Sequence, residues 1–339
     1  MEDIIVKSHK KVIWLSLLQG YAILLVIIGH VALNFKFVDT EHPAVNIIFN
    51  IIYGFHMPLF IFISGFLFYY TKIFKEIPYK TMMKDKFKRL YVPMLFFTII
   101  TCVLKTLAAS FVLHPVHYTW KYFLDVFLFY KETPFAITWF LIALLVLMSL
   151  YPLYVFVLKK KYLEVMFLFF TLILSYIGID TMYFQLNNVA FLLLFFFSGI
   201  LVAKYKMHRF LVLKKSFIFL SICFISINML VQVKLLDFIF EPQILAFIGI
   251  MFSFSLCMNL SKHFPFLFLS FRNYTYQIFL IGIYFQLLIR YLYIAHPHLL
   301  PYWIFYVISI LLGLYMPVLI SKCVEKLLEE IRYVCHFEK

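Results

Sequence analysis

Three polar side chains, Gln19, His30 and His56, stand inside the first two long apolar runs of the sequence. Gln19 and His30 are eleven residues apart, and eleven steps of about 100° bring two side chains back to one helix face, roughly three turns apart. An imidazole inside an apolar helix is costly, so its default interpretation is functional. A neutral imidazole can take a proton from a hydroxyl near physiological pH.

The two histidines are predicted to lie at similar depth. His30 is about 18 residues from the inner end of the first run and His56 about 14 from that of the second, so their depths differ by about 6 Å. Pro58 removes a backbone donor and should loosen the second helix near His56, and Ser64-Gly65 should let a neighbouring helix approach closely. The alternative is that each histidine only hydrogen-bonds an adjacent helix.

Composition defines the class of protein. The chain has 339 residues, of which 65% are hydrophobic and 21% aromatic, and its mean hydropathy is +0.97. A soluble domain of this length would be only about half apolar. We therefore predict an all-α, polytopic integral membrane protein, with residues 1–339 forming a single transmembrane domain.

The net charge of +14 would suggest nucleic acid for a soluble protein, but here the basic residues fall in loops, where they report topology. No nucleic-acid partner is predicted. The sequence has no GxxxxGK[ST] phosphate loop and no zinc-type cysteine spacing. Its five cysteines are scattered, three of them in apolar runs, which argues against a disulfide framework.

About ten runs are long enough to span a membrane. They cover roughly 12–35, 44–70, 90–113, 136–158, 162–179, 185–203, 211–233, 240–260, 268–292 and 302–321. With a cytoplasmic N-terminus, the inner segments hold 24 Lys and Arg and the outer segments five. This asymmetry predicts that both termini are cytoplasmic and that the number of spans is even.

The longest outer segment, residues 114–135, carries His114, His117, Tyr118 and Trp120 before an apolar stretch. It is predicted to form a helix at the outer membrane interface. Its aromatic residues fit an interfacial belt or, alternatively, a surface on which a sugar stacks. The two histidines have metal-ligand spacing, but no carboxylate or cysteine is close by in the sequence, so no metal is predicted.

Several short motifs follow one another along the first third of the chain. Gln19 precedes Gly29-His30, Phe55-His56-Met57-Pro58-Leu59-Phe60 precedes Ser64-Gly65, and the third run begins Arg89-Leu90-Tyr91-Val92-Pro93. Thr138-Trp139-Phe140-Leu141 and Asn273-Tyr274-Thr275-Tyr276 follow. In this combination the chain resembles the family-3 membrane acyltransferases, which include polysaccharide O-acetylases and O-succinylases, and looks closest to the fucose-acetylase-like and intercellular-adhesin-modifying branches. The resemblance is specific over roughly residues 15–95.

The resemblance implies acyl transfer from acyl-CoA, with acetyl the expected group, to a hydroxyl of a cell-surface carbohydrate or glycolipid. It implies His30 as the general base and His56 as a group that orients the acceptor or stabilises developing charge. The family has a basic residue where this chain has Gln19, which can hydrogen-bond a carbonyl or phosphate but carries no charge.

Donor and acceptor contacts follow from the same resemblance. Gln19 is expected to contact the thioester or pantetheine, and Arg89 the CoA phosphates, because Arg89 ends a basic loop where an apolar stretch begins. Trp139, Trp120 and Tyr118 are expected to stack on the acceptor sugar. The protein is placed in the cell membrane among its lipids.

A second class of function also fits a polar cavity within ten spans: a transporter or flippase for a polysaccharide or lipid-linked sugar. Such proteins often contain two related halves with broken helices, and no internal repeat is evident here. The motifs also crowd into the first third of the chain, which favours the enzyme. A purely structural or accessory protein is the third interpretation.

Overall fold

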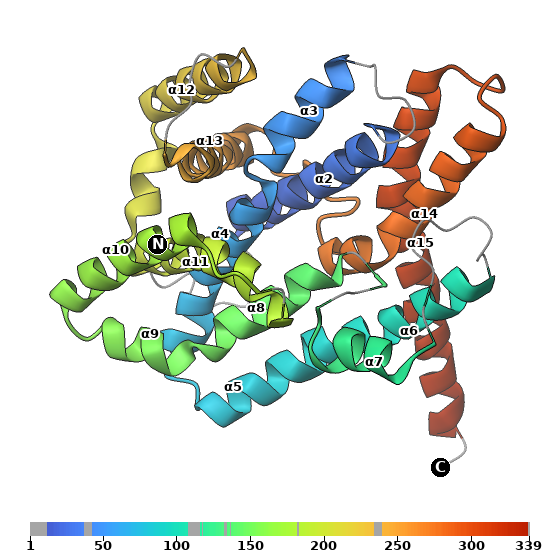
Figure 1. Cartoon of the computed structure of the whole chain (residues 1–339), viewed down its shortest axis with the longest axis horizontal. Coiled ribbons are helices and arrows are strands. Elements are labelled where there is room, and N and C mark those ends of the chain that lie inside the picture. The colour runs from blue at the N-terminus through green and yellow to red at the C-terminus, as the bar shows by residue number, and fades with distance from the viewer. Residues whose placement is uncertain are drawn as a thin grey trace. The chain divides into compact units, whose positions relative to one another are not determined.

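The computed structural model (Figure 1) describes residues 12–36, 43–107, 116, 118–131, 134–135, 137–181, 183–233 and 239–337; side chains are described for these except residues 36, 212, 214 and 330–337. All regular structure within these ranges is helical. The prediction of an all-α protein is thereby confirmed. The chain divides into two compact units, Met1–Phe60 with His208–Lys339, and Ile61–Met207.

The first unit surrounds α2. Its helices are α2 (Ile13–Lys36), α3 (Pro43–Tyr53), the start of α4 (His56–Phe68), α12 (Lys214–Gln232), α13 (Glu241–His263), α14 (Thr275–Ala295) and α15 (Tyr302–Phe337). Helix α2 is apolar on nearly all sides and contacts α3, α13, α14 and α15. A helix of this kind is stable only when enclosed, and α2 therefore supplies side chains to two buried clusters, one with α14 and α15 and one that also includes α3.

Helices α14 and α15 run antiparallel side by side (Figure 1). Gly282 lies against the carbonyl of Gly313. Near the end of α14 and the start of α15, the rings of Tyr293 and Tyr302 are in contact, with centroids 5.7 Å apart. Small residues at such a crossing let backbones approach closely, which is how helices gain contact where lipid offers no hydrophobic driving force.

The second unit contains the rest of α4, then α5 (Tyr79–Lys86), α6 (Val92–Leu107), α7 (Trp120–Phe123), α8 (Thr138–Ser149), α9 (Tyr151–Val157), α10 (Lys161–Ile177) and α11 (Leu186–Lys204). Helices α4 and α11 cross through two glycines: a Cβ at Gly65 would overlap the carbonyl of Phe196, and one at Gly199 would overlap that of Phe62. The predicted close approach at Ser64-Gly65 is confirmed.

Eight described helical segments are long and apolar enough to cross a membrane: Ile13–Phe35, Pro43–Ile73, Tyr79–Leu107, Tyr183–Lys204, Lys215–Gln232, Glu241–His263, Thr275–Ala295 and Tyr302–Glu329. The pair α8 and α9, bent by 47°, makes a ninth if it is one span. The predicted run at 162–179 appears as α10, whose 17 residues extend about 26 Å, short of a hydrocarbon core of about 30 Å. A polytopic membrane protein is confirmed, with eight or nine such segments described where about ten were predicted.

Several predicted boundaries differ from the structure; the ninth run, for example, was expected from residue 268, but α14 begins at Thr275. The third span was expected from residue 90, but its helix begins at Tyr79, because α5 continues through a π-helical turn at Phe87–Tyr91 into α6. In the segment predicted to be outer, α7 and a second π-helical turn at Leu124–Leu128 make a short helical stretch, and Thr119 caps it by accepting a hydrogen bond from the backbone N–H of Tyr122.

Candidate active site

The second candidate span is broken beside His56. Helix α3 ends at Tyr53 and α4 begins at His56, with a turn at Gly54 and Phe55 between them. Pro58 explains the position of the break: it has no N–H to donate to the carbonyl of Gly54, four residues earlier, and its ring would clash there. The predicted loosening by Pro58 therefore falls one turn before the proline. Irregular backbone at membrane depth occurs where it is buried in protein or lines a polar cavity, and Phe55 and His56 at this turn are buried.

The break orients the ring of His56. Its Nδ1 lies 2.8 Å from the carbonyl oxygen of Ile52, the group that the backbone N–H of residue 56 would engage in a regular helix. A carbonyl only accepts, so Nδ1 carries the proton and donates. In the neutral ring Nε2 is then a bare lone pair, which no described residue engages by a hydrogen bond. His56 is buried, with 2% of its surface exposed.

His30 lies on α2 against the same turn of α3. The hydroxyl of Tyr53 is 3.5 Å from Nδ1 of His30, and the two rings meet edge to face. Gly29 makes this approach possible: a Cβ there would lie 3.0 Å from Cγ2 of Ile52 and 3.3 Å from Cε2 of Tyr53. His30 is only half-buried, so it is the more accessible of the two imidazoles.

Tyr53 stands between the histidines. Its ring centroid is 4.7 Å from that of His56 and 6.4 Å from that of His30. Within the described residues no carboxylate pairs with either imidazole. The partner of His30 is therefore the neutral hydroxyl of Tyr53. A tyrosine hydroxyl can accept as well as donate, so it can accept from Nδ1–H of His30 both before and after the ring takes up a proton.

Gln19 lies on α2 with His30, and its side chain is half-buried. Its neighbour Gly20 touches a turn-rich segment between α13 and α14, because a Cβ on Gly20 would lie 2.7 Å from Cβ of Arg272 and 3.1 Å from that of Phe268. Arg272 is thus a cation beside the Gln19 region. In the sequence analysis Arg272 was included only among the Lys and Arg residues of the inner segments. Its position directly before the Asn273-Tyr274 motif could have identified it as a candidate site residue.

Arg89 belongs to the second unit and is exposed. It lies in the π-helical turn Phe87–Tyr91, and Pro93 accounts for that turn, since it has no N–H to offer the carbonyl of Arg89. Such π-turns occur frequently at functional sites. The motif that begins at Arg89 therefore lies in an irregular turn of the helix, and Arg89 is the cation on that turn.

The predicted sugar-stacking residues also belong to the second unit. Trp139 is half-buried in the first turn of α8. Trp120 and Tyr118 are exposed over 77% and 67% of their surfaces, and the hydroxyl of Tyr118 is hydrogen-bonded to that of Thr106. His114 and His117 lie outside the described residues. Among the residues that the structure describes, no group of three His, Cys, Asp or Glu is arranged to hold a metal ion.

The structure thus brings His30 and His56 together through Tyr53, which the sequence analysis did not single out. Its position directly before Gly54-Phe55-His56 was the available signal. Gln19 shares α2 with His30 in the first unit, whereas Arg89, Trp139, Trp120 and Tyr118 are residues of the second.

A many-helix membrane protein with two imidazoles beside an interrupted span fits an intramembrane enzyme or a transporter. Comparison with family models identifies the enzyme class: the model of the acyltransferase domain of the acyltransferase 3 family matches residues 12–322, and the chain belongs to that family. The match runs through both units. The protein is a membrane acyltransferase, as its motifs predicted. Searches among curated proteins and among solved structures gave no match.

Proposed function

We propose that this membrane acyltransferase moves an acyl group, acetyl in the first instance, from acyl-CoA to a hydroxyl of a cell-surface carbohydrate or glycolipid. The observation that carries the proposal is the group His30, Tyr53 and His56 at the break in the second span. It holds two imidazoles, each with Nδ1 engaged, in the setting where ionisable side chains are functional by default.

The reaction forms one ester and breaks one thioester. The acceptor hydroxyl oxygen attacks the thioester carbonyl while its proton passes to an imidazole, and collapse of the tetrahedral intermediate breaks the C–S bond. The imidazolium returns the proton to the departing sulfur, so the products are the ester and free CoA thiol. One imidazole serves first as the general base and then as the general acid, as is common in catalysis by histidine.

His30 is the proposed base, because it is the more accessible imidazole and the hydroxyl of Tyr53 lies at its Nδ1. When that hydroxyl accepts Nδ1–H, Nε2 is left free to take the proton. His56, whose Nδ1–H is committed to Ile52, offers its Nε2 as an acceptor for a second hydroxyl of the acceptor molecule, which orients that molecule for attack. Each role uses an unprotonated Nε2 of its own ring, so substitutions at each histidine are needed to tell the two roles apart.

The remaining contacts are proposals that rest on the family motifs. Gln19 is proposed for the thioester or pantetheine and Arg89 for donor phosphates. Trp139, Trp120 and Tyr118 are proposed for the acceptor sugar, since indole and phenol rings stack on the apolar faces of sugars. We also propose residence in the cell membrane with both termini in the cytoplasm, on the basis of the Lys and Arg asymmetry.

Purified full-length protein in lipid nanodiscs, given acetyl-CoA and a panel of oligosaccharide acceptors, provides the test. Mass spectrometry should find an acetylated acceptor, and thiol titration an equal amount of free CoA. His30→Gln should abolish both, because glutamine hydrogen-bonds but cannot take the proton. His56→Asn, which can still donate to the carbonyl of Ile52, should retain part of the activity. Sugar movement across vesicles without any acylated product would support the transporter instead.

Orientation is tested by labelling single cysteines in a chain whose five native cysteines have been replaced. Tyr118→Cys should react with an impermeant maleimide added to intact cells, and Pro78→Cys should react only after permeabilisation. The reverse pattern would overturn the proposed topology without affecting the proposed chemistry.

A further inference from the structure

Arg272 is held by a folded-back turn between α13 and α14. The backbone N–H of Arg272 donates to the carbonyl of Phe268, at 2.8 Å, and Nη1 donates to the carbonyls of Pro265 and Leu267, at 2.8 and 3.1 Å. Phe268 has a left-handed backbone, with φ of +61°, a conformation unusual for a bulky residue and seen where surrounding contacts impose it. One edge of the guanidinium is therefore committed to the loop and is fixed in orientation.

The rest of the guanidinium has no partner within the described part of the chain. Nε is enclosed and makes no hydrogen bond there, while Nη2 makes none either and is not among the enclosed atoms. No described carboxylate pairs with Arg272. Glu325, on α15, accepts a hydrogen bond from the hydroxyl of Tyr274, at 3.3 Å. A half-buried cation without a counter-charge is expensive, and it is relieved by an anion.

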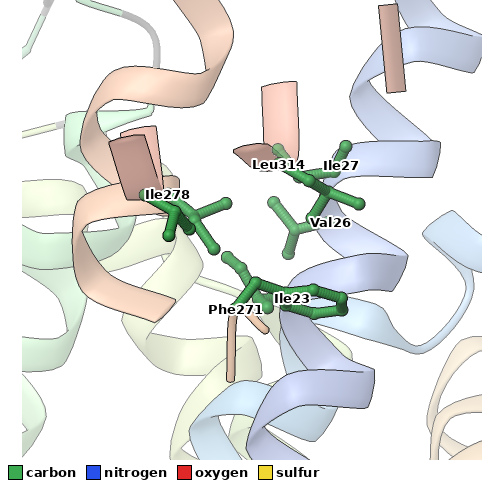
Figure 2. Close-up of a cluster of buried hydrophobic side chains, with 7 residues drawn as sticks. Ile23, Val26, Ile27, Phe271, Ile278 and Leu314 are labelled. Atoms are coloured by element: carbon green, nitrogen blue, oxygen red, sulfur yellow. The ribbon is translucent and has the colours of Figure 1, made fainter. Parts of the chain in front are cut away.

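The turn is attached to α2 on the face that leads to His30. Figure 2 shows Phe271, the residue before Arg272, beside Ile23 in a buried cluster with Val26, Ile27, Ile278 and Leu314. Gly20 abuts Arg272 one turn earlier on α2. From Gly20 to His30 is ten residues, or about 15 Å of helix rise. A long arm such as phosphopantetheine covers a separation of this order between its phosphates and its thioester.

We propose that Arg272 binds a phosphate of the acyl donor, so that the donor lies along α2 with its thioester at His30. This inference rests on the proposed function and deepens it by assigning an anchor within the first unit. Planar guanidinium donors suit phosphate oxygens, and an arginine already held on one edge loses little freedom on binding. Position 19 carries no basic residue, and Arg272 places a cation beside that part of α2.

Equilibrium binding of CoA to the purified full chain in zwitterionic nanodiscs tests the anchor independently of turnover. Arg272→Gln should weaken CoA binding about 10- to 100-fold, the range expected for hydrogen bonds to a charged group. Arg272→Lys should recover part of the affinity. Lys322→Gln, which removes an exposed charge from α15 in the same unit, is the matched control and should bind CoA normally. Gly20→Ala, which crowds Cβ of Arg272 without changing charge, should weaken binding by a smaller factor.

Initial rates with two donors separate an anchor from a structural role. Arg272→Gln should raise KM for acetyl-CoA by a similar factor but leave the rate with acetyl N-acetylcysteamine thioester, which has no phosphate, unchanged. Unchanged CoA binding in Arg272→Gln would overturn the proposal. So would equal losses with both donors, which would mean that the turn has collapsed. A stability loss confined to nanodiscs of anionic lipid, with normal CoA affinity, would assign Arg272 to a lipid headgroup and likewise overturn it.

Failure of the proposed function gives a different result. If the unmodified protein binds CoA but transfers no acyl group from either donor, acyl transfer to these acceptors is wrong, while the Arg272 comparison stands on binding alone.

Discussion

Two groups of polar side chains in the described part of the chain, one in each unit, have their hydrogen bonds satisfied in different ways. In the second unit Glu164, in the first turn of α10, accepts hydrogen bonds from the ammonium of Lys204 and from the hydroxyl of Tyr205, the latter at 2.7 Å. Lys204 also donates to the carbonyl of Leu158, at 2.8 Å. In the first unit His30, Tyr53 and His56 form a group without a carboxylate partner, and neither Nε2 has a hydrogen-bond partner among the described residues.

The difference separates a structural polar group from one suited to chemistry. Both carboxylate oxygens of Glu164 have donors, one of them the ammonium of Lys204, and the N-terminal turn of a helix further favours a negative charge; the carboxylate is therefore paired with a counter-charge and held in place. The histidine group instead keeps acceptor nitrogens beside a backbone break. Burial alone does not distinguish the two, since Glu164 is 4% exposed and His56 2%. The presence of a charged partner does: Lys204 pairs with Glu164, whereas no described carboxylate pairs with His30 or His56.

The largest effect is expected from His30→Ala. Acylation by purified protein should fall about 10²- to 10⁴-fold, the usual contribution of a general base. Protein level should change little, because an apolar residue lowers the cost of inserting α2 into the membrane. Near-normal acylation would show that His30 is structural and that the histidine group, like the Glu164 group, does not take part in the chemistry.

Glu164→Ala should affect stability and spare the chemistry. Loss of one partner of a buried ion pair costs about 3–5 kcal/mol, and the partial exposure of Lys204, 25% for its side chain, should reduce this toward about 2 kcal/mol. Thermal unfolding in detergent measures the change, with Glu164→Gln expected to lose less because it keeps an acceptor. Full stability together with lost turnover would make Glu164 a functional residue.

Tyr53→Phe tests whether the hydroxyl orients His30. The 3.5 Å separation indicates a modest hydrogen bond in the resting protein, so turnover should fall about 10-fold or less. The pH dependence of turnover should move, while KM for the donor and thermal stability stay unchanged. A loss of stability with an unaltered pH profile would reduce Tyr53 to a packing role.

The smallest effect belongs to Tyr205→Phe and depends on pH. The hydrogen bond to Glu164, together with burial, raises the pKa of Tyr205 to about 12 from its usual 10. A raised folded-state pKa stabilises the protonated phenol, so the contribution is complete below pH 10 and is lost as pH rises from about 10 to 12. Unmodified protein should unfold at a slightly higher temperature than Tyr205→Phe at pH 8, and the two should converge above pH 12. A constant difference across this range would exclude the hydrogen bond as its source.

The hydrophobic runs and motif spacing alone predict the class of fold, the family, and the histidines as a candidate site. Membrane insertion explains this success: a span must be about 20 apolar residues whatever it packs against, and a polar exception stands out within it. The same argument explains the shortfall at α10, because a run of marginal length is read as a span from hydropathy while its helix ends at the left-handed Gly178, with φ of +73°.

Only the tertiary structure decided which polar groups meet. That Tyr53 lies between the histidines depends on where Pro58 breaks the helix and on Gly29 admitting α3 to α2. That Arg272 lies beside Gly20 depends on contacts across more than 250 residues, through Phe271 and the α2 cluster. Hydropathy reports the cost of placing each residue in the membrane one at a time, whereas hydrogen bonds and counter-charges are pairwise, so partners distant in sequence are settled only when the helices pack.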